Sequence, residues 1–110
     1  MKIAIPITKN LLALHFGHSE KFCIATIENN EVLTKEEKIP PRHEPGILPK
    51  WLGEMGVNVI LAGGMGQRAQ NLFAEQNIAV KVGIAQKDAD QLIKDYLSDS
   101  IKDGQNLCDH

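Results

Sequence analysis

Aromatic residues are scarce in this chain of 110 residues, which contains three Phe, one Trp and one Tyr. Ile, Val, Leu and Ala must therefore fill the interior, and a hydrophobic content of 43% is ordinary for one globular domain. The sequence also contains no internal repeat, low-complexity tract or linker. We expect a single domain over residues 1–102, followed by a short tail over residues 103–110.

Long hydrophobic runs and an excess of positive charge are also absent. No apolar run approaches the roughly 18 residues that a membrane span needs. Twelve basic and fourteen acidic residues give a net charge of −2, which argues against a nucleic-acid-binding surface. The first residues form a strand pattern that is too short for a signal peptide. We therefore expect a cytoplasmic protein whose two cysteines are reduced and which contacts neither nucleic acid nor membrane.

Three runs with the composition of β-strands occupy the first half of the chain, at residues 2–7, 22–27 and 32–39. Asn29 and Asn30 form a turn signal between the second and third runs, which favours an antiparallel meander. The third run is the most polar and is therefore expected at an edge of the sheet. Cys23 lies inside the second run and is expected to be a buried, inert thiol.

The second half alternates strands and helices. Four prolines and one glycine in residues 40–49 predict a loop, which leads into a short helix over residues 48–55. The spacing of apolar residues then predicts strands at 57–62 and 78–82 and helices at 67–76 and 87–97. A strand–helix–strand unit implies a parallel pair of strands. The whole pattern predicts an α/β fold with a mixed sheet of roughly five strands, an antiparallel meander followed by βαβα.

None of the four histidines lies within a hydrophobic run. His15 and His18 flank Phe16 and Gly17, so their imidazoles lie on one side of a helical turn or converge across a bend at Gly17. Imidazole is a preferred ligand of several transition metals. The pair is therefore a candidate metal site, and a solvated surface loop is the alternative interpretation.

Two further groups of possible ligands lie far from this pair in the sequence. His43 stands in the proline-rich loop, where the prolines stiffen the backbone, and Arg42 beside it could neutralise an anionic ligand. Cys108, Asp109 and His110 end the chain with a thiolate, a carboxylate and an imidazole. Cys108 and His110 could close over a pocket if the tail folds back, and the alternative is a poorly ordered chain end.

A glycine-rich segment, Gly63-Gly64-Met65-Gly66, follows a predicted strand and precedes a predicted helix. Free N–H groups at the start of a helix favour anions, and Arg68 would add a charged donor. The spacing matches neither a dinucleotide-binding fingerprint nor a P-loop, so nucleotide binding is not supported. The segment is therefore a candidate floor for a bulky anionic ligand, with a packing turn and a core position for Met65 as the alternative.

Four segments of this sequence occur in an order that is typical of one family. They are Met1-Lys2-Ile3-Ala4-Ile5-Pro6, His15-Phe16-Gly17-His18-Ser19-Glu20-Lys21-Phe22, Gly63-Gly64-Met65-Gly66 and Gly104-Gln105-Asn106-Leu107-Cys108-Asp109-His110. On these segments, which span nearly the whole chain, the sequence resembles the dinitrogenase iron–molybdenum cofactor family. That family includes NifX-type carriers, the cofactor-binding domain of NafY-type proteins and the C-terminal domain of NifB-type proteins. The chain looks closest to the short, single-domain members.

The resemblance implies a ribonuclease H-like α/β fold of three layers. It also implies a non-enzymatic carrier for an iron–sulfur or iron–molybdenum cluster or its precursor, with a cluster donor or acceptor protein as partner and a monomer as a compatible state. The ligands expected on this basis are His15, His18, His43 and Cys108, with His110 as a further one. Gly64, Met65, Gly66 and Arg68 would line the floor of the site.

Two other functions remain open at this point. The same residues could form a simple Zn²⁺ or Ni²⁺ site or a small-anion binding module, which would differ from a cluster carrier in pocket size and iron content. A metal-dependent hydrolase with a ribonuclease H-like fold would need carboxylates at strand ends to hold two divalent metals. The first predicted strand, residues 2–7, contains none.

Overall fold

The computed structural model of the protein describes residues 1–41 and 46–98, which form an α/β fold. The strands are β1 (Lys2–Thr8), β2 (Leu11–Leu12), β3 (Lys21–Glu28), β4 (Glu31–Lys38), β5 (Val59–Leu61) and β6 (Ala79–Lys81). The helices are α1 (Ile47–Glu54), α2 (Gln67–Glu75) and α3 (Ala89–Leu97), with a 3₁₀ turn, η1 (Phe16–His18). Every predicted strand and helix is confirmed. The strand β2 was not predicted, and η1 corresponds to the helical turn that was one of two alternatives for the segment around Gly17.

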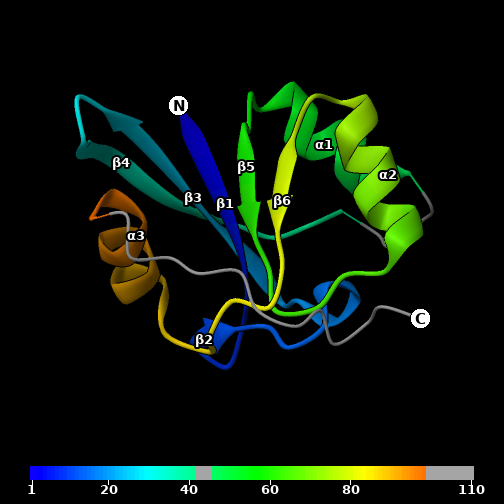
Figure 1. Cartoon of the computed structure of the whole chain (residues 1–110), viewed down its shortest axis with the longest axis horizontal. Helices are drawn as coiled ribbons and strands as arrows, with labels where there is room; N and C mark the ends of the chain where they lie inside the picture. Colours follow the sequence, from blue (N-terminus) through cyan, green and yellow to red (C-terminus); the bar gives the residue numbers. More distant parts are fainter. Residues whose placement is uncertain (42–45, 99–110) are drawn as a thin grey trace.

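A mixed sheet forms the middle of the molecule, with the strand order β4-β3-β1-β5-β6 and β2 beside β1. The pairs β1–β3 and β3–β4 are antiparallel, which confirms the predicted meander. The pair β5–β6 is parallel, as the strand–helix–strand pattern predicted, and β1–β5 is a second parallel pair that the sequence did not predict. The carboxyl ends of the parallel strands β1, β5 and β6 therefore lie at the same end of the sheet (Figure 1). The finer assignment to the ribonuclease H-like folds stays a prediction.

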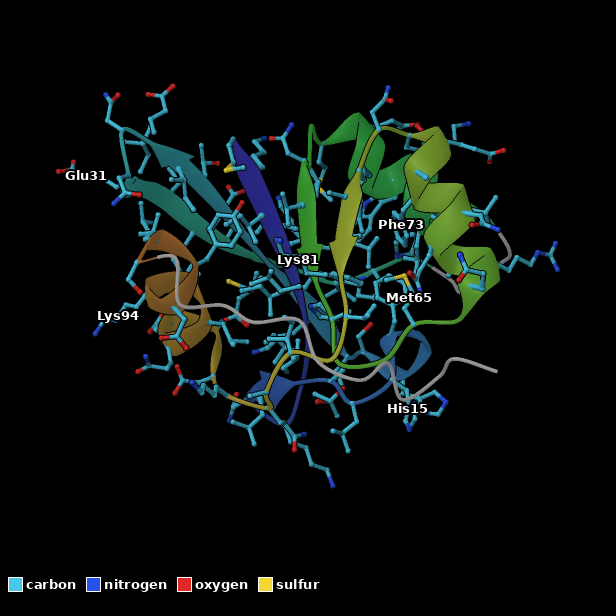
Figure 2. The ribbon with its side chains drawn as sticks, viewed as in Figure 1. His15, Glu31, Met65, Phe73, Lys81 and Lys94 are labelled. Atoms are coloured by element: carbon cyan, nitrogen blue, oxygen red, sulfur yellow. The ribbon has the colours of Figure 1, made fainter. Side chains whose placement is uncertain are left out.

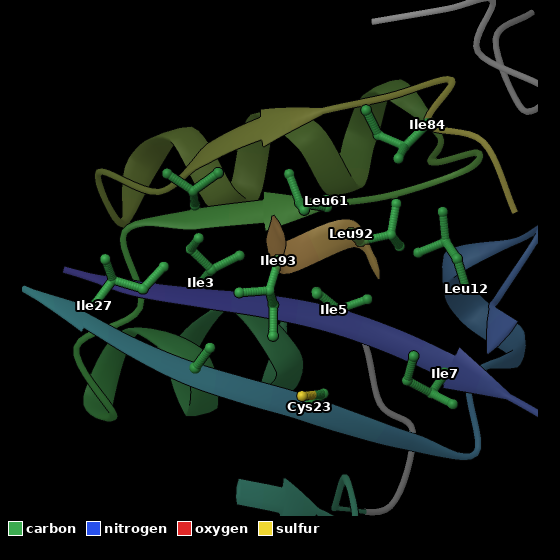
Figure 3. Packing of buried hydrophobic residues seen from close by; sticks show 12 residues of the cluster. Ile3, Ile5, Ile7, Leu12, Cys23, Ile27, Leu61, Ile84, Leu92 and Ile93 are labelled. Carbon is green, nitrogen blue, oxygen red and sulfur yellow. The ribbon is translucent and has the colours of Figure 1, made fainter. Parts of the chain in front are cut away.

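Alternate side chains of the central strands enter two separate cores, because successive residues of a strand point to opposite faces. On one face Ile3, Ile5 and Ile7 pack with Leu92 and Ile93 of α3 (Figure 3). On the other face Ala4, Phe22 and Ile60 pack against α1 and α2. Each fully buried aliphatic side chain contributes about 1.5–3 kcal/mol of transfer free energy. The three layers are therefore α3, the sheet, and the pair α1 and α2.

The edge strand β4 has all eight residues exposed, in agreement with its polar sequence. It follows a turn in which Asn29 and Asn30 have φ values of 51° and 63°, the left-handed conformation that asparagine tolerates. Lys35 in β4 forms an ion pair with Asp90 of α3.

Local signals fix the ends of the helices. Gly56, with φ of 80°, follows α1 and confirms the predicted helix end. Helix α3 begins two residues later than the predicted residue 87, because Asp88 is its N-cap and accepts a hydrogen bond from the backbone N–H of Gln91 at 2.8 Å. None of the helices in the described part of the chain has the length and hydrophobicity of a membrane span.

Candidate functional site

A pocket of about 360 Å³ opens on the α1 and α2 side of the sheet, beside the edge where β1 and β5 end. Its walls come from η1, the first turn of α1, the turn after β5, and α2. The lining residues are His15, Phe16, Gly17, Gly46, Leu48, Pro49, Gly64, Met65, Gly66, Arg68, Ala69, Leu72 and Phe73. Ligands of open α/β sheets bind at this position, outside the carboxyl ends of the strands.

The histidine turn (residues 15–18) is fixed to the sheet by backbone hydrogen bonds. His15 forms an isolated parallel bridge with Gly64, and the N–H of Phe16 donates to the carbonyl of Gly64 at 2.9 Å. The hydroxyl of Thr8 donates to the carbonyl of His18 at 3.0 Å. The side chain of Phe16 is buried and packs edge-on against Phe73. The turn therefore has a defined position at the pocket.

The two imidazoles of this turn lie next to each other. Their ring centres are 5.7 Å apart, with an angle of 65° between the ring planes. Both side chains are exposed, and His15 lines the pocket. Two imidazoles that bind the same metal ion have ring centres roughly 5–6 Å apart, because each metal–nitrogen distance is about 2 Å. The geometry is therefore compatible with a shared metal at the mouth of the pocket.

The glycine turn (residues 63–66) joins β5 to α2 and packs directly under the histidine turn. A Cβ at Gly63 would lie 3.0 Å from the carbonyl oxygens of both Ala13 and Leu14, so only glycine fits there without displacing backbone. The N–H of Gly83 donates to the carbonyl of Gly63 at 2.7 Å, which also ties the turn to the segment after β6. This close approach brings the two predicted motifs together.

Helix α2 starts at the pocket without a side-chain cap. Its N-cap is Gly66, which makes no side-chain hydrogen bond to the first turn, and Gly66, Arg68 and Ala69 all line the pocket. The start of a helix carries a partial positive charge and unpaired N–H groups. Arg68 is exposed and adds a full positive charge, while no acidic side chain is among the described residues that line the pocket. The pocket therefore favours an anionic ligand.

The floor of the pocket is apolar. Met65 and Phe73 are 1% and 0% exposed and lie between the sheet and α2, whereas His15 lies at the end of the molecule toward which β1 runs (Figure 2). Met65 thus satisfies both interpretations of the sequence, since it belongs to the core and lines the pocket. The amide of Gln70 donates to the carbonyl of Met65 at 2.8 Å and holds the turn against α2.

Several predicted site residues lie outside the described residues, namely Arg42, His43, Cys108 and His110. Among the residues that the structure describes, no group of three or more His, Cys, Asp or Glu side chains is placed to hold a metal ion. The described part therefore supplies two imidazoles, and any further protein ligands of a shared metal would come from the rest of the chain.

Sequence reasoning missed the apolar walls of the pocket. Leu48 and Pro49 of α1 and Leu72 of α2 line it together with Phe16, and none of these was among the predicted site residues. The amphipathic pattern of α1 and α2 indicated which face of each helix is apolar and packs toward the interior. It could not indicate that some side chains of that face border a cavity instead of filling the core.

Cys23 lies away from this pocket, on the α3 face of the sheet, and is a free, buried cysteine as predicted. Burial raises the pKa of its thiol, because the thiolate would lose its hydration, and the nearby Lys35 only partly opposes this effect. A thiol in this state is a poor nucleophile and a poor metal ligand.

Several known proteins resemble this chain in sequence or in fold. The protein MJ0580 of Methanocaldococcus jannaschii is 39% identical over 85 residues, which cover 73% of this chain and 72% of that protein. The crystal structure of PH0822 has a TM-score of 0.86 and 30% identity, with 93% of each chain covered. The apo form of the orange protein from Desulfovibrio gigas shares the fold, with a TM-score of 0.75 and 18% identity over 96% of this chain and 93% of that chain.

A family model gives the assignment for nearly the whole chain. The model described as dinitrogenase iron–molybdenum cofactor matches residues 1–99. The match includes the histidine turn, the glycine turn and all the strands and helices described above. The chain therefore belongs to the dinitrogenase iron–molybdenum cofactor family.

Proposed function

We propose that this protein is a non-enzymatic carrier that binds an iron–sulfur or iron–molybdenum-type cluster, or a precursor of one, in the pocket between the histidine turn and α2. The observation that carries the proposal is the bridge between His15 and Gly64, which holds an imidazole at the mouth of a pocket of about 360 Å³. Family membership over residues 1–99 supports the same ligand class.

The residues around the pocket match the chemistry of such a ligand. His15 and His18 offer neutral nitrogen ligands to iron or molybdenum. Arg68 and the start of α2 offset the negative charge that these clusters carry. The apolar floor around Met65 and Phe73 excludes water from the sulfide faces of the cluster. The pocket thus combines a few metal ligands with a large contact surface.

We further propose that residues outside the described part complete the site. His43 and Cys108, with His110 as a further ligand, would add donors from the proline-rich loop and the tail, and Arg42 would add positive charge. A small number of exchangeable ligands suits a carrier, which must hold its cargo and also release it to an acceptor protein. The proposal includes a single domain over residues 1–102, a tail over residues 103–110 and a cytoplasmic location, and a monomer is compatible with it.

The test is the metal content of protein purified without oxygen. Iron, molybdenum and acid-labile sulfide are measured for the natural sequence and for the double variant His15→Ala/His18→Ala. We expect bound sulfide with iron or molybdenum in the natural sequence and loss of most of it in the variant, because both described ligands are removed. The thermal unfolding temperature should stay the same, since both side chains are exposed.

A matched control is Lys94→Ala, which changes an exposed residue of α3 on the opposite side of the sheet (Figure 2). This variant should retain the metal and sulfide of the natural sequence. Equal metal and sulfide content in the histidine variant would contradict the proposal.

A simple Zn²⁺ or Ni²⁺ site is the second candidate function. The observation that favours it is the pair of adjacent imidazoles with ring centres 5.7 Å apart, which suits a single ion without any cluster. The same elemental analysis separates the two functions. Zinc or nickel without sulfide would favour the ion site, whereas iron or molybdenum with sulfide would favour the carrier.

A further inference from the structure

Two glycines that line the pocket, Gly17 and Gly66, are not required by the backbone or by packing. Neither has the positive φ at which glycine is favoured, and the N-cap Gly66 has φ of −64°. A Cβ built on either residue meets no heavy atom within 4 Å. Side chains at these two positions would therefore extend into open space at the border of the pocket.

Two other glycines of the site behave differently. A Cβ on Gly63 would lie 3.0 Å from the carbonyl oxygens of residues 13–14, so packing requires glycine there. Gly46, which lines the pocket, has φ of 81° and so has a conformational reason to be glycine. Gly17 and Gly66 have neither reason: the space beside them is free, as it is beside Gly46, but their backbone conformation does not call for glycine. One belongs to η1 and the other to the start of α2, so they border the pocket on two separate elements.

We propose that Gly17 and Gly66 determine the size of ligand that can reach His15, and that they admit a ligand of many atoms in contact with both turns. A single ion bound by His15 and His18 needs only about 2 Å of space around each nitrogen. A pocket of about 360 Å³ is much larger than such an ion requires, given about 30 Å³ for each water molecule. The two glycines are thus specificity-determining residues for a cluster, and this inference rests on the proposed function.

The experiment compares two probes on the full chain without oxygen. One probe is a synthetic tetrairon–tetrasulfide cluster with four 2-mercaptoethanol ligands. An imidazole displaces one of these ligands as the thiolate, which takes a proton from the buffer and is released as the thiol. The other probe is Zn²⁺. The variants are Gly17→Ala, Gly17→Val and Gly66→Ser, the last chosen because serine is a good N-cap and preserves the start of α2. The control is Gly53→Ala in α1, outside the pocket, where the added Cβ meets only the flexible side chain of Gln76.

We expect each added side chain to weaken cluster binding by about tenfold or more, and Gly17→Val to weaken it more than Gly17→Ala. Binding of Zn²⁺ should not change in any variant, because the histidines remain in place. The control should bind both probes as the natural sequence does. Thermal unfolding, measured in parallel, confirms that each variant is folded, and the exposed Gly17 keeps the test valid if Gly66→Ser is unstable.

Three results would overturn the inference, and they can be told apart. If the natural sequence takes up the cluster and the glycine variants bind it equally well, the two glycines do not select for size, while the proposed carrier function stands. If the natural sequence binds Zn²⁺ but not the cluster, the carrier function fails and the inference fails with it. If the variants bind the cluster and Zn²⁺ with equally reduced affinity, the histidine turn is disturbed in general, and this result also counts against size selection.

Discussion

At the scale of single residues, the site depends on how closely two backbone turns approach each other. The carbonyls of Ala13 and Leu14 pass over Gly63 at a distance that leaves no room for a Cβ. The segment cannot easily move away, because the N–H of Ala13 donates to the carbonyl of Pro6 at 2.9 Å and the N–H of Phe16 donates to Gly64. The hydrogen atom in place of a side chain at Gly63 therefore allows the histidine turn to lie on the glycine turn.

The variant Gly63→Ala should lower the free energy of unfolding by about 1–3 kcal/mol, because a methyl group is forced against fixed backbone. Chemical denaturation measures this change. Gly17→Ala is the matched control, since its added methyl group meets nothing within 4 Å and its stability should equal that of the natural sequence. Equal stability of both variants would show that the approach of the two turns is looser than described.

At the scale of elements, side-chain hydrogen bonds stabilise α3 in addition to the packing of its buried face. Asp88 caps its first turn, and Asp95 accepts hydrogen bonds from Lys87 and Gln91 at 2.9 and 2.8 Å. These bonds keep the pKa of Asp95 below its ordinary value. Because the folded-state pKa is lowered, any stabilisation from Asp95 is present above the ordinary pKa of an aspartate and is lost as the pH falls through the lowered value.

The variant Asp88→Ala should destabilise the protein by about 1 kcal/mol, because the N–H of Gln91 loses its acceptor. Asp88→Asn is the control and should retain most of the stability, since the asparagine side chain offers an equivalent oxygen. Thermal and chemical unfolding measure both. A stable alanine variant would indicate that packing of Leu92 and Ile93 alone fixes the start of α3.

At the scale of the whole molecule, the proposed tail ligands lie apart in the sequence from the hydrophobic cores. In the described part of the chain, both cores consist of buried residues between Ile3 and Ile93. Cys108 and His110 are proposed only as ligands, and they lie after the matched residues 1–99. Changes at the end of the chain are therefore expected to affect binding without affecting the stability of the fold.

The double variant Cys108→Ala/His110→Ala should bind less iron or molybdenum and sulfide than the natural sequence, with an unchanged unfolding temperature. The reason is the loss of a thiolate and an imidazole that the proposed site uses. Asp109→Ala is a control at the same end of the chain, because a carboxylate is a poorer ligand for these soft clusters. Full metal content in the double variant would remove the tail from the site and leave the cargo to the histidine turn and His43.

The sequence by itself determined the elements of the fold and the residue types of the site. Alternating apolar residues and β-branched runs predicted the strands, and apolar residues at helical spacing predicted the helices. The polar composition of residues 32–39 predicted that β4 lies at an edge of the sheet. The short β2 was missed, because a two-residue strand has no periodic signal and depends on pairing with β1. The turn η1 was anticipated only as one of two alternatives, a helical turn or a bend at Gly17. The grouping of His15 and His18 was readable because three residues separate neighbours on one helical turn.

Only the tertiary structure decided that these residues form one pocket. The contact of His15 with Gly64 depends on β5 lying beside β1, a parallel pairing over more than fifty residues that no local pattern encodes. The walls provided by Leu48 and Leu72 depend on how α1 and α2 pack on the same face of the sheet. Side-chain chemistry is a property of each residue, whereas the shape of a cavity follows from long-range packing. For that reason the sequence indicated only the candidate ligands, and the tertiary structure decided that a pocket lies beside His15.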